Sequence, residues 1–194
     1  MRDKRLALGI SAWELSFMFG KTDFLVRDAE NPLITRRYNI DDTNYLLLIF
    51  DEKLPSVMPP KTEQDINHLE IISYFNEIRN NVYEIFIRDA KKVDYIFFKT
   101  IEVEKKYQEL PTDLILSSFN EVKGYIDSLL KEDYFDEPKR ALDIFNKCKE
   151  QLGERFHPRN MVKVLNYYTN KKSGIAKLNK DQKDDFGRTM FKKV

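Results

Sequence analysis

The chain has 194 residues, with 33 Lys and Arg, 32 Asp and Glu and a single Cys, and its apolar residues make up 42%. With only 6 Gly and 7 Pro, this composition is typical of a folded, helix-rich protein and excludes a disordered one. The chain lacks a run of 18 apolar residues and has one Cys, so we expect no membrane span, no intrachain disulfide and a reducing compartment, the cytoplasm.

Four helices are predicted before residue 55. Gly9 ends the first helix, and the Ser11 hydroxyl can cap the second. Gly20 tolerates positive φ at the turn into the third helix. Asp41 and Asp42 suit the N-terminus of the fourth helix, whose apolar side chains come from TNYLLLIF.

A proline-rich break follows these helices. Pro55, Pro59 and Pro60 interrupt any helix, so we place a domain boundary between residues 1–60 and 61–194. Beyond the break, a further helix is predicted over 66–78 from apolar residues at helical spacing, which are Ile66, Leu69, Ile72, Phe75 and Ile78.

The apolar period then changes to two residues. Tyr83, Ile85 and Ile87 alternate with other side chains, and the same alternation continues from Val93 to Val103. This pattern predicts an antiparallel hairpin over 83–103 with its turn at 88–92. A continued helix from Ile66 to Tyr107 is the alternative.

The last third of the chain predicts three helices and two strands. One helix opens at Pro111 and Thr112, a second ends at Gly153, and a third starts at Pro158. Two strands separated by a charged loop are predicted after Gly174. The order helix, helix, hairpin is the outline of a winged helix, and a small helical domain with a frayed basic tail is the alternative.

The first part of the chain carries a motif of fixed spacing. Its members are Arg5, Gly9, Ile10, Ser11, Glu14, Leu15, Gly20, Val26, Glu30, Asn31 and Pro32. This motif resembles the lambda-repressor-like helix-turn-helix family, the group of Cro and the phage repressors, over roughly the first 55 residues. The expected fold is therefore mainly α: a four- or five-helix helix-turn-helix domain, then a mostly helical region with a small hairpin and a winged-helix-like C-terminal hairpin.

The resemblance implies that the start of the third helix enters the major groove of duplex DNA. The implied DNA-contacting residues are Lys21, Thr22, Asp23, Phe24, Arg27, Arg36 and Arg37. Asp23 would accept a hydrogen bond from cytosine and Phe24 would touch a thymine methyl group, whereas the lysine and the two later arginines would contact phosphates. It also implies a structural ion pair between Arg5 and Glu30. We therefore expect a sequence-specific transcription regulator that binds DNA as a homodimer.

Charge keeps a second hypothesis open. Residues 1–60 hold eight basic and nine acidic side chains, whereas a DNA-binding module usually shows a basic footprint. A protein-interaction module that grips a partner with Phe24 and Leu25 is the alternative. Ten basic and three acidic residues follow His157, and this basic end could add phosphate contacts.

No pattern of residues indicates catalysis or a cofactor. His68 and His157 have no metal-ligand spacing, and we expect Cys148 to be a small buried apolar residue rather than a nucleophile. Tyr167 and Tyr168 are expected to lie in a core rather than to stack on a base. We therefore expect no enzyme, no metal and no cofactor.

Overall fold

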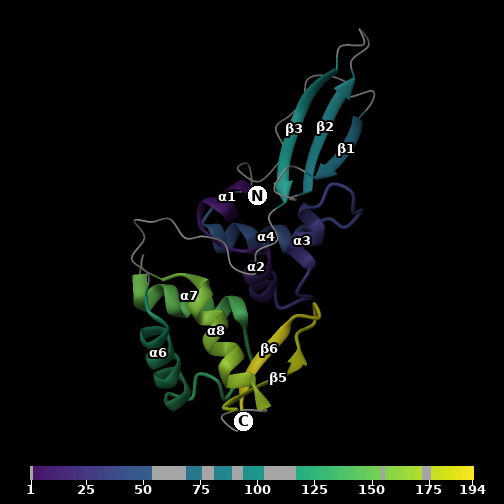
Figure 1. Cartoon of the computed structure of the whole chain (residues 1–194). Coiled ribbons are helices and arrows are strands. Elements are labelled where there is room, and N and C mark those ends of the chain that lie inside the picture. The colour runs from purple at the N-terminus through teal and green to yellow at the C-terminus, as the bar shows by residue number, and fades with distance from the viewer. Residues whose placement is uncertain are drawn as a thin grey trace.

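The computed structural model describes residues 2–53, 69–75, 81–88, 94–102, 117–153, 156–171 and 176–194. Within these ranges the fold is mainly helical with two three-stranded antiparallel sheets, as the sequence predicts in outline. Helices come first, one sheet follows and projects from them, and a second helical unit with its own sheet ends the chain (Figure 1). The predicted domain boundary at residue 60 lies outside the described residues.

The N-terminal helices are α1 (Arg2–Ala7), α2 (Ala12–Phe19), α3 (Leu25–Glu30) and α4 (Ile40–Phe50). Helix α2 begins with a capping box, in which the Ser11 hydroxyl accepts from the Glu14 N–H at 3.1 Å and the Glu14 carboxylate accepts from the Ser11 N–H at 2.6 Å. Asn39 and Asp42 form the same box at the start of α4. These boxes satisfy N–H groups that have no partner inside the helix, which fixes where each helix begins.

Gly20 ends α2 in the left-handed conformation, with φ of 66°. Its N–H donates to the Phe17 carbonyl at 2.9 Å, and the chain then turns into α3. The Ser16 hydroxyl accepts from the Val26 N–H at 3.0 Å, which ties the two helices together across the turn. The predicted turn at Gly20 is therefore confirmed, and Ser16 has a polar role in addition to its small size.

The projecting sheet contains β1 (Leu69–Phe75), β2 (Asn81–Arg88) and β3 (Asp94–Glu102) in the order β1-β2-β3. Strands β2 and β3 are antiparallel, with a bulge between Ile85 and Phe86. The two predicted strands and their antiparallel pairing are confirmed, and the alternative of a continuous helix through this region is wrong. The predicted turn lies outside the described residues, apart from Arg88, which belongs to β2.

The helix predicted over 66–78 is also wrong, because its described part is strand β1. Its sequence, LEIISYF, is rich in β-branched and aromatic residues, which pack well on a pleated surface. Leu69, Ile72 and Phe75 stand three apart, but apolar residues also lie between them, so the spacing does not separate helix from strand. Pairing with β2 along its whole length decides the strand.

The C-terminal unit comprises α6 (Phe119–Lys131), β4 (Lys139–Arg140), α7 (Ala141–Leu152), α8 (Pro158–Thr169), β5 (Leu178–Lys183) and β6 (Thr189–Lys193). Its sheet has the order β4-β6-β5. The predicted sequence of helix, helix and hairpin is confirmed, so the chain after Lys177 is not a frayed tail. Strand β4 was not predicted, because two residues carry no periodicity.

Helix α6 begins later than the sequence predicts. Ser117 and Ser118 are not helical, and the Ser118 side chain caps the helix in a capping box with Glu121. A single helix from Thr112 onward is therefore wrong, because Ser118 and Glu121 provide a stronger start signal than Thr112 does. The predicted end of α7 at Gly153 and the predicted start of α8 at Pro158 are confirmed.

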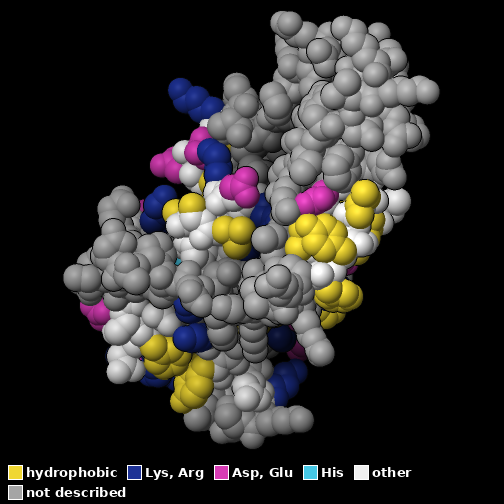
Figure 2. All heavy atoms as spheres, turned by 45° about the horizontal axis from the view of Figure 1, so that its top comes forward, with side chains coloured by type: hydrophobic (Ala, Val, Ile, Leu, Met, Phe, Trp, Pro, Cys, Tyr) yellow, Lys and Arg dark blue, Asp and Glu magenta, His cyan; other side chains and the backbone are white. Residues whose placement is uncertain are grey.

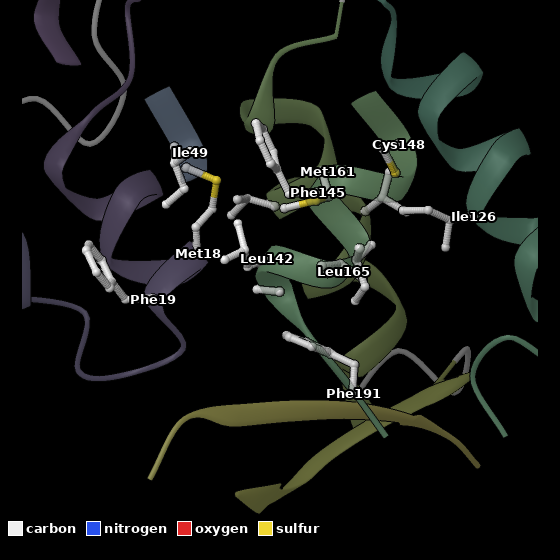
Figure 3. Close-up of a cluster of buried hydrophobic side chains, with 14 of the residues drawn as sticks. Met18, Phe19, Ile49, Ile126, Leu142, Phe145, Cys148, Met161, Leu165 and Phe191 are labelled. Carbon is white, nitrogen blue, oxygen red and sulfur yellow. The ribbon is translucent and has the colours of Figure 1, made fainter. Parts of the chain in front are cut away.

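One hydrophobic core joins the N-terminal helices to the C-terminal unit. Met18 and Phe19 of α2 belong to the same buried cluster as Leu142 of α7, Met161 of α8 and Phe191 of β6 (Figure 3). Side chains of Phe17 and Phe191 also pair across the junction, with ring centroids 5.8 Å apart. The two parts are therefore packed against each other through apolar surface, which stabilises their relative position.

Candidate nucleic-acid interface

The start of α3 is the site that the sequence proposes for DNA. Thr22, Asp23 and Phe24 are exposed, whereas Leu25 and Val26 are buried in the core. The two buried side chains hold the start of α3 against the core, so the three residues before them face solvent. Leu25, which the protein-interaction alternative placed on the surface, is not available to a partner.

Arg27 and Phe24 form a stacked pair at this surface. The guanidinium lies 4.3 Å from the centre of the Phe24 ring, and the aromatic side chain is 55% exposed. Arg27 also donates to the Asp28 carboxylate at 2.9 Å. The positive charge of Arg27 is therefore partly neutralised by its own neighbour.

Lys21 is held away from the proposed phosphate contact. Its Nζ lies 2.6 Å from the Asp42 carboxylate, which is buried at the start of α4. Because Asp42 also completes the α4 capping box, this carboxylate has a fixed position. Lys21 would have to leave a mostly buried ion pair to contact DNA, and leaving Asp42 unpaired is costly.

Arg36 and Arg37 are the most accessible of the proposed cations, and both are exposed. Arg36 lies 4.0 Å from Asp28, and Arg37 donates to the backbone carbonyls of Ile34 and Arg36. Basic and acidic side chains lie next to one another on the face drawn in Figure 2. The structure therefore brings the predicted cations to the neighbourhood of α3, but acids accompany most of them.

The ion pair implied by the resemblance is present. Arg5 donates to Glu30 through Nε at 3.0 Å and Nη2 at 2.5 Å, and Nη1 donates to the Ile10 carbonyl at 2.8 Å. Arg5 is only 4% exposed, so its charge is matched inside the fold. This pair ties α1 to the end of α3 and thereby fixes the helix that carries the candidate site.

A polar contact between the N-terminal helices and α8 was not predicted. Arg159 in α8 donates to the Glu14 carboxylate at 2.8 Å and to the Gly9 carbonyl at 3.0 Å. His157 lies beside this contact: its Nδ1 accepts from the Arg159 N–H, and its Nε2 is 3.0 Å from the Leu8 carbonyl. The ring must therefore be neutral with its proton on Nε2, and burial lowers the pKa of His157.

The C-terminal hairpin contacts the turn at Gly20. The Thr189 N–H donates to the Gly20 carbonyl at 2.6 Å, and a Cβ on Gly20 would lie 3.0 Å from the Thr189 nitrogen. The buried Arg188 guanidinium lies 4.0 Å from the Tyr45 ring of α4. Gly20 is thus required for close approach as well as for its φ, which the sequence pattern of the turn does not reveal.

The remaining candidates lack the surroundings of a chemical site. Cys148 is buried, and desolvation raises the pKa of its thiol to about 12, so the thiolate is suppressed. Within the described ranges, no group of three or more His, Cys, Asp and Glu side chains is arranged to hold a metal ion. Tyr168 is buried as expected and donates to Asp127, whereas Tyr167 reaches the surface. His68 lies outside the described residues.

The chain matches no protein-family model, no curated protein and no solved structure. Of the helices that the structure describes, none has the length and apolarity to cross a membrane.

Proposed function

We propose that the protein is a transcription regulator that binds duplex DNA as a homodimer through the start of α3. One observation carries the proposal: Thr22, Asp23 and Phe24 are exposed while Leu25 and Val26 anchor the helix in the core. An arrangement of this kind supports base reading, because the side chains that face solvent stand on a rigid helix pair.

The contacts behind α3 support the same proposal. The Ser16 hydroxyl holds the Val26 N–H, and Glu30 holds Arg5 with two hydrogen bonds. These bonds restrict the helix at both ends, so little ordering remains to be done when it meets DNA. Preorganisation of this kind raises affinity without adding contacts.

The charges predict which residues supply affinity. Arg36 and Arg37 are exposed, so they reach phosphates more easily than Lys21, which is paired with the buried Asp42. To contact a base edge or a phosphate, the Arg27 guanidinium has to leave the Asp28 carboxylate, which lies 2.9 Å away in the free chain. Affinity should therefore be modest and should depend mainly on the exposed arginines.

Binding to a pool of random-sequence duplexes tests the proposal. The full chain is titrated into labelled duplexes at several salt concentrations, and bound sequences are recovered. Arg37→Ala should reduce the slope of log affinity against log salt by about 1. Arg27→Ala or Asp23→Ala should change the selected sequence, at about 1–3 kcal/mol for each lost base contact.

A matched control is Lys147→Ala, which removes an exposed lysine from α7. It should leave affinity, slope and selected sequence unchanged. Light scattering of the free chain measures the expected dimer. An absence of salt-dependent binding by the wild-type chain to any duplex in the pool refutes the proposed function.

A protein partner is the second candidate, and the Phe24 and Arg27 pair favours it. An exposed aromatic ring stacked with an arginine is typical of the residues that dominate protein interfaces. Phe24→Ala then abolishes capture of the partner, and no variant shows DNA binding. This candidate is excluded if the chain binds duplex DNA and if Phe24→Ala changes the capture of no protein.

A further inference from the structure

Strand β1 forms one end of the projecting sheet (Figure 1). Every residue of Leu69–Phe75 pairs with β2, and among the described strands β2 is the only neighbour of β1. Alternate residues of a strand direct their N–H and C=O groups to opposite sides, so roughly half of the backbone groups of β1 point away from β2. An edge of this kind is a template on which a further strand can pair.

The side chains of β1 do not protect this edge. All five side chains over 71–75 are exposed, and Phe75 is 70% exposed. The Tyr74 hydroxyl donates to Glu84 of β2 at 2.9 Å, so this side chain leans away from the outer edge. Proteins usually blunt an edge strand with lysine, proline or a bulge. The segment LEIISYF contains neither residue, and the bulge lies between β2 and β3 instead, so β1 has the features of a contact surface.

We propose that the outer edge of β1 pairs in antiparallel orientation with β1 of a second copy of the chain, which joins the two three-stranded sheets into one. In an antiparallel ladder, opposite residues direct their N–H and C=O groups alike. Opposite positions of two identical strands therefore differ by an even number, which places the two-fold axis at a residue and not between two residues. Ile72 is the middle residue of β1, so an axis at Ile72 pairs the whole strand.

The sequence of β1 suits this register. Residue 72 comes opposite its own copy, so two exposed isoleucine side chains meet at the axis, and Leu69 pairs with Phe75 at each end. The single charged residue, Glu70, comes opposite Tyr74, whereas a parallel pairing of the two strands would set two acids side by side. Because β1 is complementary to itself, a second copy of the chain is the occupant that fits this edge.

The sheet also connects this contact to the helix proposed to read DNA. Tyr83 of β2 is buried, and the side-chain amide of Asn31, which ends α3, lies 3.5 Å from its hydroxyl. Pairing through β1 therefore relates two α3 helices by a two-fold axis, as two half-sites on a duplex require. The inference rests on the homodimer of the proposed function and names its contact, but its test uses no DNA.

Cysteine crosslinking of the full chain tests the register. Ile72→Cys places a thiol opposite its own copy, at a Cα separation of about 4.5–5.5 Å, which a disulfide spans. Mild oxidation should therefore convert most of this variant to a covalent dimer. Phe75→Cys is the matched control, because position 75 is more exposed but its two copies lie about 20 Å apart in this register, so it should form little covalent dimer. The native Cys148 is buried and does not compete.

Light scattering of the full chain measures the dimer without a crosslink. The wild-type chain should have the mass of two chains. Ile72→Lys should be monomeric, because the register sets the two introduced charges directly opposite each other. Leu48→Lys, at an exposed apolar residue of α4, is the control and should remain dimeric. Thermal unfolding checks that each variant is folded, and the two cysteine variants decide the matter if Ile72→Lys does not fold.

The outcomes separate the β1 contact from DNA binding. A monomeric wild-type chain, a dimer that Ile72→Lys leaves intact, or equal crosslinking of Ile72→Cys and Phe75→Cys overturns the β1 contact. The duplex titration then still decides whether the chain binds DNA. A dimer that shows the expected crosslinks but binds no duplex supports the β1 contact and refutes DNA binding.

Discussion

The guanidinium of Arg159 in α8 donates to the carboxylate of Glu14 in α2 at 2.8 Å. The same carboxylate accepts the Ser11 N–H and so closes the capping box of α2. Glu14 has no exposed side-chain surface, and Arg159 is 12% exposed. The buried Glu14 carboxylate thus caps the start of α2 and also binds α8, which lies far along the chain.

Arg159→Ala should lower the free energy of unfolding by about 3–5 kcal/mol, because it leaves the Glu14 charge buried without its cation. Urea denaturation measures the loss. The exposed pair of Lys147 and Glu150 provides the comparison, and Lys147→Ala should change stability by no more than about 0.5 kcal/mol. A loss below about 1 kcal/mol for Arg159→Ala would show that water replaces the cation.

Gly20→Ala should destabilise the fold more than Gly187→Ala does. Both glycines have positive φ, which costs alanine about 1–2 kcal/mol, but only Gly20 would bring a Cβ to 3.0 Å from a backbone nitrogen. Gly124 lies in α6 with open space around it, so Gly124→Ala should raise stability by roughly 1 kcal/mol. Thermal unfolding of the three variants measures the order, and equal losses for Gly20 and Gly187 would contradict the close approach.

Acid should weaken the fold through His157. Burial lowers its pKa in the folded chain below the unfolded value of about 6.5, so the unfolded chain binds the extra proton first. Stability from this group is complete above pH about 6.5 and falls as the pH drops, by at most about 1.4 kcal/mol per pH unit. Glu14, which favours the charged ring, and Arg159, which opposes it, are the charged groups beside it.

Urea denaturation at several pH values measures this loss. His157→Asn keeps a side-chain acceptor at the start of α8 but removes the titrating ring. Its stability should therefore depend less on pH between about 5 and 6.5 than that of the wild-type chain. Identical pH dependence in the two proteins would rule out His157 as the source.

Arg188 should tolerate methionine but not alanine. Its Nε and Nη2 atoms are buried, and among the described atoms they have no hydrogen-bond partner. Arg188 Nη1 lies 3.7 Å from the Asp184 carboxylate, which also accepts from the backbone N–H groups of Phe186 and Arg188 and keeps these two donors in the variant. Arg188→Met removes the desolvation cost and keeps a long side chain against Tyr45, so stability should stay within about 1 kcal/mol or rise. Arg188→Ala leaves a cavity and should cost about 2–5 kcal/mol. If the two variants lose equal stability in urea denaturation, the stabilising interaction is the stacking of the guanidinium on Tyr45, which both variants lack.

Short-range signals made much of this fold predictable. Gly20, Gly153 and Pro158 act through backbone conformation, so their effect on helix ends is local. The same holds for the Ser11 cap. Segments that depend on pairing were less predictable: LEIISYF forms a strand because β2 lies beside it, although its spacing also fits a helix.

The candidate site was predictable only in part for the same reason. Exposure of Thr22 and Phe24 follows from the helix pattern, but the contact of Lys21 with Asp42 depends on where α4 packs. Arg159 and Glu14 are 145 residues apart, and no local pattern relates them. Contacts of this kind follow from the packing of the core rather than from the motif.

The shared core makes the helical body discontinuous along the chain. Its buried cluster runs from Ile10 to Ile49 and resumes from Val122 to Phe191, and the side chains of β1 and β2 that the structure describes, at 71–75 and 82–84, are not among its members. The sheet is therefore an insert in this body. A fragment cut at residue 60 would carry Met18 and Phe19 without the apolar surface they contact in the C-terminal unit. Two fragments divided within the insert retain both halves of the core and should reassemble without a covalent link.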